Sequence, residues 1–121
     1  MRGVTFITHK GTKIAYQDWS YAKPDEILAL IEKAKELVVL QPKNSVLSLI
    51  NVKGAGFNLA VSNAVREFAK FNTPYVKYTA IYGVEGLQEV IFRGIITFTG
   101  RKNIALVKTL EEGKDLLASK K

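Results

Sequence analysis

The residues best suited to chemistry lie at 53–58, where Lys53-Gly-Ala-Gly56 is followed by Phe57 and Asn58. Glycine lets a backbone come close to a ligand, and amide groups at the start of a helix attract anions. We therefore predict that an anion, or an acidic group of a partner, binds through Gly54, Gly56, Phe57 and Asn58. The competing interpretation is a tight turn that needs glycine only for its backbone angles. The loop lacks the third glycine of a dinucleotide-binding fingerprint and the Gly-Lys-Ser/Thr end of a P-loop.

A second candidate surface lies on residues 85–99, which we expect to form a helix that is apolar around most of its circumference. One face would carry Leu87, Val90, Ile91, Gly94, Ile95 and Phe98. Phe92 and Ile96 would lie on the opposite side as a second apolar stripe. Such a stripe is either covered within the chain or presented to a lipid, a partner or a second copy. We predict that Phe92 and Ile96 contribute to self-association or to a lipophilic pocket, with burial in the monomer as the alternative.

Groups suited to catalysis or metal binding are few. His9 is the single histidine, Asp18 is the one acid in the predicted N-terminal hairpin, and the chain has no cysteine. The serines at 45, 48 and 62 have no predicted base beside them. We therefore predict no catalytic residue, no metal site and no cofactor, and a protein that is not an enzyme.

The formal net charge is +7, from 18 basic and 11 acidic residues, which favours contact with anionic surfaces. The basic residues are nevertheless scattered, and acids and lysines alternate within 32–36. A solvated basic surface is therefore the favoured interpretation. Tyr78 and Tyr82 point the same way on one predicted strand and could stack on nucleic acid, but packing under a helix is the more ordinary arrangement. Nucleic-acid or anionic-surface binding stays the alternative function.

The elements that position these residues follow from local patterns. Alternation in 4–9 and 12–19, separated by Lys10-Gly11, predicts an antiparallel hairpin. An amphipathic helix begins at Pro24 and ends before Pro42. The apolar run from Val46 to Val52 predicts a strand covered on both faces.

The second half of the chain repeats this alternation of strand and helix. Asn58 caps a helix that continues to Asn72, and a strand follows at 75–82. After the helix at 85–99, closed by Gly100, a strand at 103–108 leads to a helix opened by a capping box at Thr109. The order is ββαβαβαβα. Right-handed crossovers then predict a mixed five-stranded α/β sheet with one antiparallel edge strand.

Composition agrees with one domain over residues 1–121, since 47% of residues are hydrophobic and 24% are charged. The first apolar run is interrupted by His9 and Lys10, so a signal peptide is not indicated. The chain also lacks a run of about 18 apolar residues, the length that a membrane-spanning helix needs. We expect a cytoplasmic protein without a membrane span.

Four stretches, taken with the order of elements, resemble a known family. They are 41–49 (QPKNSVLSL), 52–58 (VKGAGFN), 67–77 (EFAKFNTPYVK) and 81–87 (IYGVEGL). The chain is similar over nearly its whole length to small SpoIIAA-like (STAS/Sec14-related) proteins of bacteria and archaea. The resemblance implies the β-α superhelix shared by anti-sigma-factor antagonists and CRAL-TRIO lipid-transfer domains, which bind a regulatory protein partner or enclose a lipophilic molecule.

The resemblance departs from the family at one functional position. Anti-sigma-factor antagonists carry a phosphorylatable serine where the helix after the central strand begins, whereas this chain has Gly56, Phe57 and Asn58, with the nearest hydroxyl at Ser62. A phosphorylation switch is therefore not indicated. We expect a non-enzymatic regulatory or ligand-binding domain whose partner is a regulatory protein, a second copy of the chain, or a lipophilic or anionic small molecule.

Overall fold

Residues 3–121 are described in the computed structural model, where five strands form one mixed sheet in the order β1-β2-β3-β4-β5. The predicted domain also includes residues 1 and 2, which lie outside the described residues. The strands are β1 (Gly3–His9), β2 (Thr12–Asp18), β3 (Val46–Asn51), β4 (Val76–Tyr82) and β5 (Ile104–Val107). β1 pairs with β2 antiparallel, and every other neighbouring pair is parallel. The predicted fold class and element order are confirmed.

The hairpin between β1 and β2 turns at Lys10 and Gly11, whose φ angles are 50° and 75°. Two residues with positive φ form the turn whose twist matches that of the flanking strands, and here they leave His9 paired with Thr12. The predicted antiparallel hairpin is confirmed, and its two-residue turn sets the register of the two strands.

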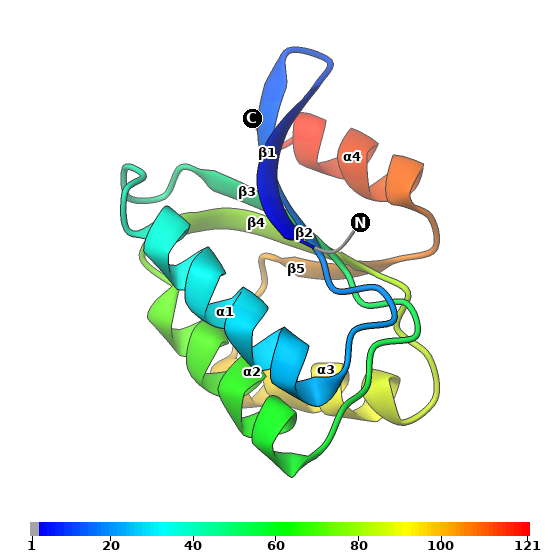
Figure 1. The fold of residues 1–121 in the computed structure, drawn as a ribbon. Helices are drawn as coiled ribbons and strands as arrows, with labels where there is room; N and C mark the ends of the chain where they lie inside the picture. The colour runs from blue at the N-terminus through cyan, green and yellow to red at the C-terminus, as the bar shows by residue number, and fades with distance from the viewer. Residues whose placement is uncertain (1–2) are drawn as a thin grey trace.

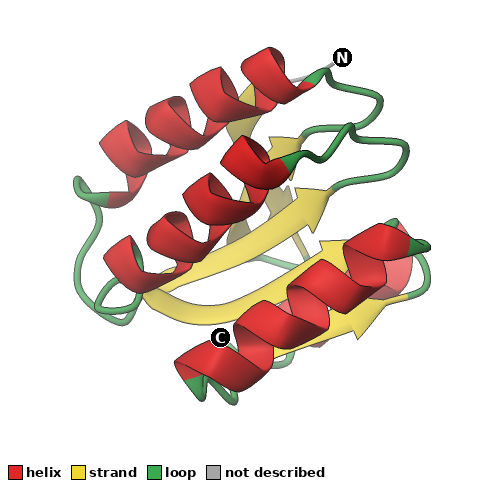
Figure 2. Cartoon of the chain, turned by 90° about the horizontal axis from the view of Figure 1, so that it is seen from below, coloured by secondary structure: helices red, strands yellow, loops and turns green. Residues whose placement is uncertain are grey.

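Three helices cover one face of the sheet and a fourth covers the other (Figure 1). The first group is α1 (Pro24–Val38), α2 (Leu59–Phe71) and α3 (Leu87–Thr99), and the fourth is α4 (Leu110–Ala118). Figure 2 shows the same division from below. Because each crossover steps to the next strand in the same direction with the same hand, the three crossover helices fall on one face. No helix of residues 3–121 has the length and apolar character needed to cross a bilayer.

The two faces of the sheet pack against different helices. All six residues of β3 are buried, which matches the prediction of a strand covered on both sides. Ile50 belongs to the cluster formed with α1, α2 and α3, whereas Leu49 belongs to the cluster with Leu117 of α4. Tyr78 and Tyr82 pack against this second cluster, the ordinary role predicted for strand tyrosines.

The capping box predicted at α4 forms with one change. The Glu112 amide donates to Thr109 Oγ1 at 3.0 Å, as a threonine cap requires. The Glu112 carboxylate, however, accepts from the Lys108 amide at 2.8 Å. The side chain therefore reaches one residue beyond the cap, and the start of α4 still has both a hydroxyl and a carboxylate as acceptors.

The stripe of Phe92 and Ile96 faces inward, which is the burial alternative that the sequence left open, and most of the other apolar face of α3 points to solvent. Phe92 and Ile95 are buried, while Leu87, Val90 and Phe98 are 70%, 68% and 63% exposed. The ring of Phe92 lies 5.5 Å from the ring of Phe57, centroid to centroid, which places it among the core aromatics. Both faces of α3 are apolar, so helical periodicity did not distinguish them. Packing against Phe57 and the sheet decides which face turns inward.

Candidate functional site

The glycine loop at 53–58 connects β3 to α2 and is held by its own neighbours. The Gly56 amide donates to the Ala22 carbonyl at 2.9 Å. The Ala55 amide donates to the Val52 carbonyl at 3.0 Å. These two amides are already paired, so they are not free to bind an anion, and the predicted cradle is incomplete as it stands.

Packing accounts for both glycines. Gly54 has a φ of +66°, and a β-carbon built on it would lie 2.4 Å from ring atoms of Tyr21. A β-carbon on Gly56 would lie 3.2 Å from Pro24 Cδ. The glycines therefore allow the loop to pass close beneath Tyr21 and the start of α1.

Asn58 caps α2 as predicted. Its Oδ1 accepts from the Val61 amide at 2.9 Å, and its backbone is extended. Ser62 lies in the first turn of the same helix and is half-buried. Asn58 therefore has a structural role at this position, because its side chain satisfies a free amide of the helix.

An open groove of about 270 Å³ lies between the loop and the start of α3. It is lined by Gly54, Ala55, Phe57, Glu85, Leu87 and Gln88. Gln88 Nε2 donates to the Ala55 carbonyl at 2.6 Å, which joins α3 to the loop. The structure therefore brings two of the predicted site residues, Gly54 and Phe57, to the exposed side chain of Leu87.

The exposed face of α3 carries Leu87, Val90, Gly94 and Phe98, which we call the outer stripe. These residues recur every three or four positions, so they lie along one side of the helix. A β-carbon on Gly94 would meet no atom within 4 Å outside its own helix among the described residues. Arg66 and Lys70 of α2 place their charged groups 5.4 Å and 5.3 Å from the centre of the Phe98 ring.

A cavity of about 40 Å³ lies under the inner face of α3, and we call it the α3 cavity. Phe92 and Ile96, the two predicted residues of this helix, both line it. Most of the remaining lining is apolar: Trp19, Ile50, Val65, Phe68, Ala69, Ile81, Ile95 and Ile104. Three polar residues, Asn72, Thr79 and Arg101, complete the wall. The structure therefore places the predicted stripe inside the chain, at a small pocket.

Arg101 is the one charged residue that lines this cavity within the described chain. Its Nε donates to Asn103 Oδ1 at 3.0 Å. Its Nη1 donates to Asn72 Oδ1 at 3.0 Å and to the Ala69 carbonyl at 3.2 Å. Burial lowers the pKa of Arg101, because a low dielectric disfavours the charged form. Sequence patterns did not indicate this residue, because an arginine directly after a helix cap is ordinarily a surface cation.

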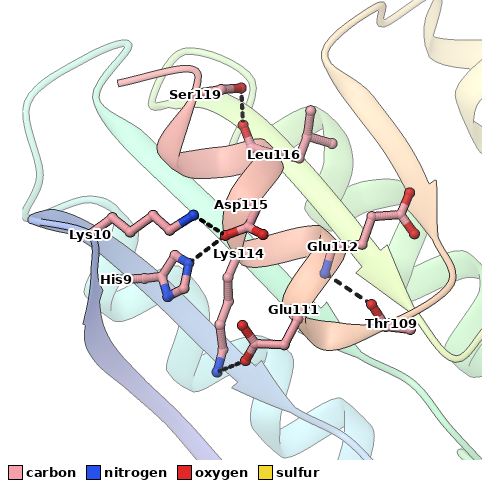
Figure 3. A network of polar contacts seen from close by, with 9 residues as sticks. All are labelled: His9, Lys10, Thr109, Glu111, Glu112, Lys114, Asp115, Leu116 and Ser119. Atoms are coloured by element: carbon pink, nitrogen blue, oxygen red, sulfur yellow. Dashed lines mark hydrogen bonds and ion pairs between the residues drawn. The ribbon is translucent and has the colours of Figure 1, made fainter.

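A polar network joins the hairpin to α4 (Figure 3). His9 Nε2 and Lys10 Nζ lie 2.8 Å and 2.9 Å from Asp115 Oδ1. Hydrogen bonds from His9 and then from Lys10 hold the pKa of Asp115 below its ordinary value. Donor atoms of His9, Glu111 and Asp115 lie within 4.8 Å of one another, so these residues could hold a metal ion. The Lys10 ammonium already forms an ion pair with the Asp115 carboxylate that a metal ion would need. The absence of a metal site stays a prediction.

The groups that nucleophilic catalysis would need do not meet. His9 pairs with Thr12 beside the hairpin turn, whereas Asp18 pairs with Gly3 at the other end of the hairpin. Asp18 accepts from the Ser20 hydroxyl at 2.6 Å, and His9 bonds Asp115 instead. His9 and Asp18 therefore do not form one cleft with a hydroxyl. That the chain is not an enzyme stays a prediction.

Comparison with known proteins supports the fold. No model of a protein family matches the chain, and no curated protein matches its sequence. Among solved structures, an anti-sigma-factor antagonist (STAS) domain protein from Planctomyces limnophilus matches with a TM-score of 0.65 and 11% sequence identity. The match covers 96% of this chain and 98% of that one. The chain therefore has the fold of a STAS domain, as the resemblance predicted.

Proposed function

We propose that this STAS-like chain is a non-enzymatic regulatory domain that acts by binding protein, and that it binds through the outer stripe of α3. The observation that carries the proposal is the exposure of three large apolar side chains, Leu87, Val90 and Phe98, at helical spacing on one face. Contiguous exposed apolar surface is typical of an interaction site. The groove beside Gly54 and Phe57 extends this surface, because Leu87 belongs to both.

The occupant that fits best is a second copy of the chain. Gly94 stands at the centre of the outer stripe, with Val90 four residues before it and Phe98 four residues after it. In an antiparallel pair of α3 helices that cross at Gly94, Val90 of each copy faces Phe98 of the other. The missing side chain at Gly94 lets the two backbones approach closely at the crossing point.

Charge at this face is mixed, because Arg66 and Lys70 of α2 flank the Phe98 ring whereas α3 itself carries a paired acid and base. The chain carries a net charge of +7, so two copies repel each other over most of their surfaces. On α3, Glu89 and Arg93 form an ion pair with 3.2 Å between Oε2 and Nε, which leaves their combined charge at zero. The stripe alone is smaller than the roughly 800 Å² per partner of a standard interface. We therefore expect a weak, reversible dimer.

Sedimentation equilibrium over a series of protein concentrations tests this proposal. The weight-average mass should rise from 13.4 kDa towards twice that value as concentration increases. Leu87→Glu and Val90→Glu should abolish the rise, because each places a charge in the contact. Leu40→Glu is the matched control: Leu40 is 76% exposed but lies just after α1, so this variant should still dimerise.

A constant mass at every concentration, or equal dimerisation of all three variants, would contradict the proposed contact. The alternative function, binding of nucleic acid or another anionic surface, predicts a different result. Single-stranded DNA would then bind with an affinity that collapses as salt is added, because phosphate contacts release counterions. Leu87→Glu and Val90→Glu would reduce that binding no more than Leu40→Glu does.

A further inference from the structure

Two residues that line the α3 cavity each carry a buried hydrogen-bond donor that no residue of 3–121 satisfies. Nη2 of Arg101 and Nε1 of Trp19 are buried and have no hydrogen-bond partner, and both residues line the cavity. Buried polar groups are almost always paired, since an unpaired one loses its bonds to water without replacement. Both groups are N–H donors, so the missing partner is an acceptor.

The charge of Arg101 makes an anion the best acceptor. All the described partners of its other donors are neutral oxygens, from Asn72, Asn103 and Ala69. None of the ion pairs among residues 3–121 includes Arg101. Guanidinium stays protonated in proteins, so Arg101 carries a half-buried positive charge that has no counter-ion among residues 3–121. A carboxylate suits the free Nη2 edge, because charge-assisted bonds are the strong ones.

Most of the rest of the cavity is apolar, and we propose that it binds a small amphipathic carboxylate. The head group accepts hydrogen bonds from Arg101 Nη2. The hydrocarbon tail lies against Ile81 of β4 and against Phe92 and Ile95 of α3. This site is on the inner face of α3, so it is separate from the outer stripe and does not depend on the proposed dimer.

The cavity is too small to hold the whole ligand without a change in the structure. A volume of about 40 Å³ holds roughly three water molecules, enough for a head group but not for a tail. The half-buried lining residues Ile96, Arg101 and Ile104 mark where the cavity approaches the surface. The tail therefore needs one wall to move outward.

Helix α3 is the wall best able to move. It fully buries two side chains, Phe92 and Ile95, whereas α1 and α2 bury four each, so α3 is held by less apolar packing than either of them. The residues on either side of it, Gly86 and Gly100, have φ angles of 54° and 66°, and a β-carbon on either would meet open space in the described structure. Glycines at both ends let the backbone change direction at low cost. Ligand binding thus displaces α3 while the sheet stays fixed.

Trp19 provides the readout, because it is the only tryptophan and is fully buried at the cavity. Octanoate is titrated into the full chain while tryptophan fluorescence is recorded, with octanol and octylammonium as neutral and cationic probes of the same length. We expect a saturable change with octanoate, weaker binding of octanol, and no binding of octylammonium. The proposal is overturned by the absence of a saturable change with octanoate, the result for a cavity that holds only water, or by equal affinity for the three probes.

Variants then separate the head-group contact from the cavity. Arg101→Gln should weaken octanoate binding about tenfold or more and leave octanol binding unchanged, since it removes a charge-assisted hydrogen bond. Arg93→Gln is the matched control, an exposed arginine on α3, the helix that Arg101 follows, and should bind octanoate normally. Equal octanoate affinity of the two variants would rule out the head-group contact.

A second variant keeps the test decisive if Arg101→Gln does not fold. Ile96→Phe retains Arg101 and adds volume at the cavity, so it should weaken octanoate and octanol binding together. Unchanged binding by this variant would place octanoate elsewhere. Leu87→Glu should prevent dimerisation and still bind octanoate, so the experiments distinguish failure of the dimer proposal from failure of the ligand proposal.

Discussion

Gly113 of α4 and Leu49 of β3 approach so closely that no side chain fits between them. A β-carbon built on Gly113 would lie 2.7 Å from Leu49 Cδ1 and 3.2 Å from Val107 Cγ2. This contact seats α4 on the sheet face opposite α1, α2 and α3 (Figure 1). A helix-interior glycine, ordinarily unfavourable, is therefore required here by packing.

Gly113→Ala should destabilise the fold although alanine is the better helix former. Alanine gains about 1 kcal/mol in helix propensity, but overpacking a tight core site costs about 1–3 kcal/mol. Since Leu49 is itself fully buried, its side chain has little free space into which to move, and we expect the cost to exceed the gain. Urea unfolding followed by circular dichroism measures the difference, and a midpoint equal to or above that of the unmodified chain would contradict the contact.

Gly94→Ala should have the opposite effect on the monomer. Gly94 is also inside a helix, but it is exposed and a β-carbon there meets no neighbour outside its own helix in the described structure. The substitution should stabilise the monomer by about 0.5–1 kcal/mol. Unfolding is measured at a concentration too low for dimerisation. A loss of stability under these conditions would indicate that Gly94 is covered within one chain.

Asn58→Ala should weaken the start of α2. The substitution removes the acceptor of the Val61 amide and should cost about 1 kcal/mol of unfolding free energy. Asn58→Ser and Asn58→Asp retain an acceptor and should lose less, which makes them the controls in the same urea titration. If Asn58→Ala unfolds at the same urea concentration as Asn58→Asp, the cap does not contribute as described.

Asp115 should make part of the folding stability depend on pH in the acidic range. Its pKa lies below the ordinary value of 3.8 because His9 and Lys10 bond the carboxylate in the folded chain. Its contribution is therefore fully present above pH 3.8 and is lost as the pH falls through the lower folded pKa. Asp115→Asn should be less stable than the unmodified chain at neutral pH, and the gap should close at strongly acidic pH.

Thermal melts of both chains across this range check the effect. Glu111→Gln, one turn earlier on α4, leaves the bonds from His9 and Lys10 to Asp115 in place and serves as the control. A gap between the Asp115→Asn variant and the unmodified chain that stays constant down to the most acidic pH would show that the carboxylate is not responsible.

The sequence by itself determined the order of elements, the hairpin and the helix caps. These features depend on local properties: positive φ at Lys10 and Gly11, the acceptor of Asn58, and the alternation of apolar residues along each strand. The parallel order of the sheet followed as well, because short right-handed crossovers leave few other arrangements. Resemblance to SpoIIAA-like proteins led to the same STAS fold that the structure has.

Only the tertiary structure decided which side of α3 turns inward and what the glycine loop is for. Both faces of α3 are apolar, so their contacts, with Phe57 on one side and solvent on the other, had to be seen in three dimensions. Tyr21 explains Gly54 only once the two segments are brought together. Arg101 and Trp19 meet at one cavity from distant parts of the chain, as do His9 and Asp115 at one network. Such pairings depend on how separate elements pack, so local periodicity in the sequence does not predict them.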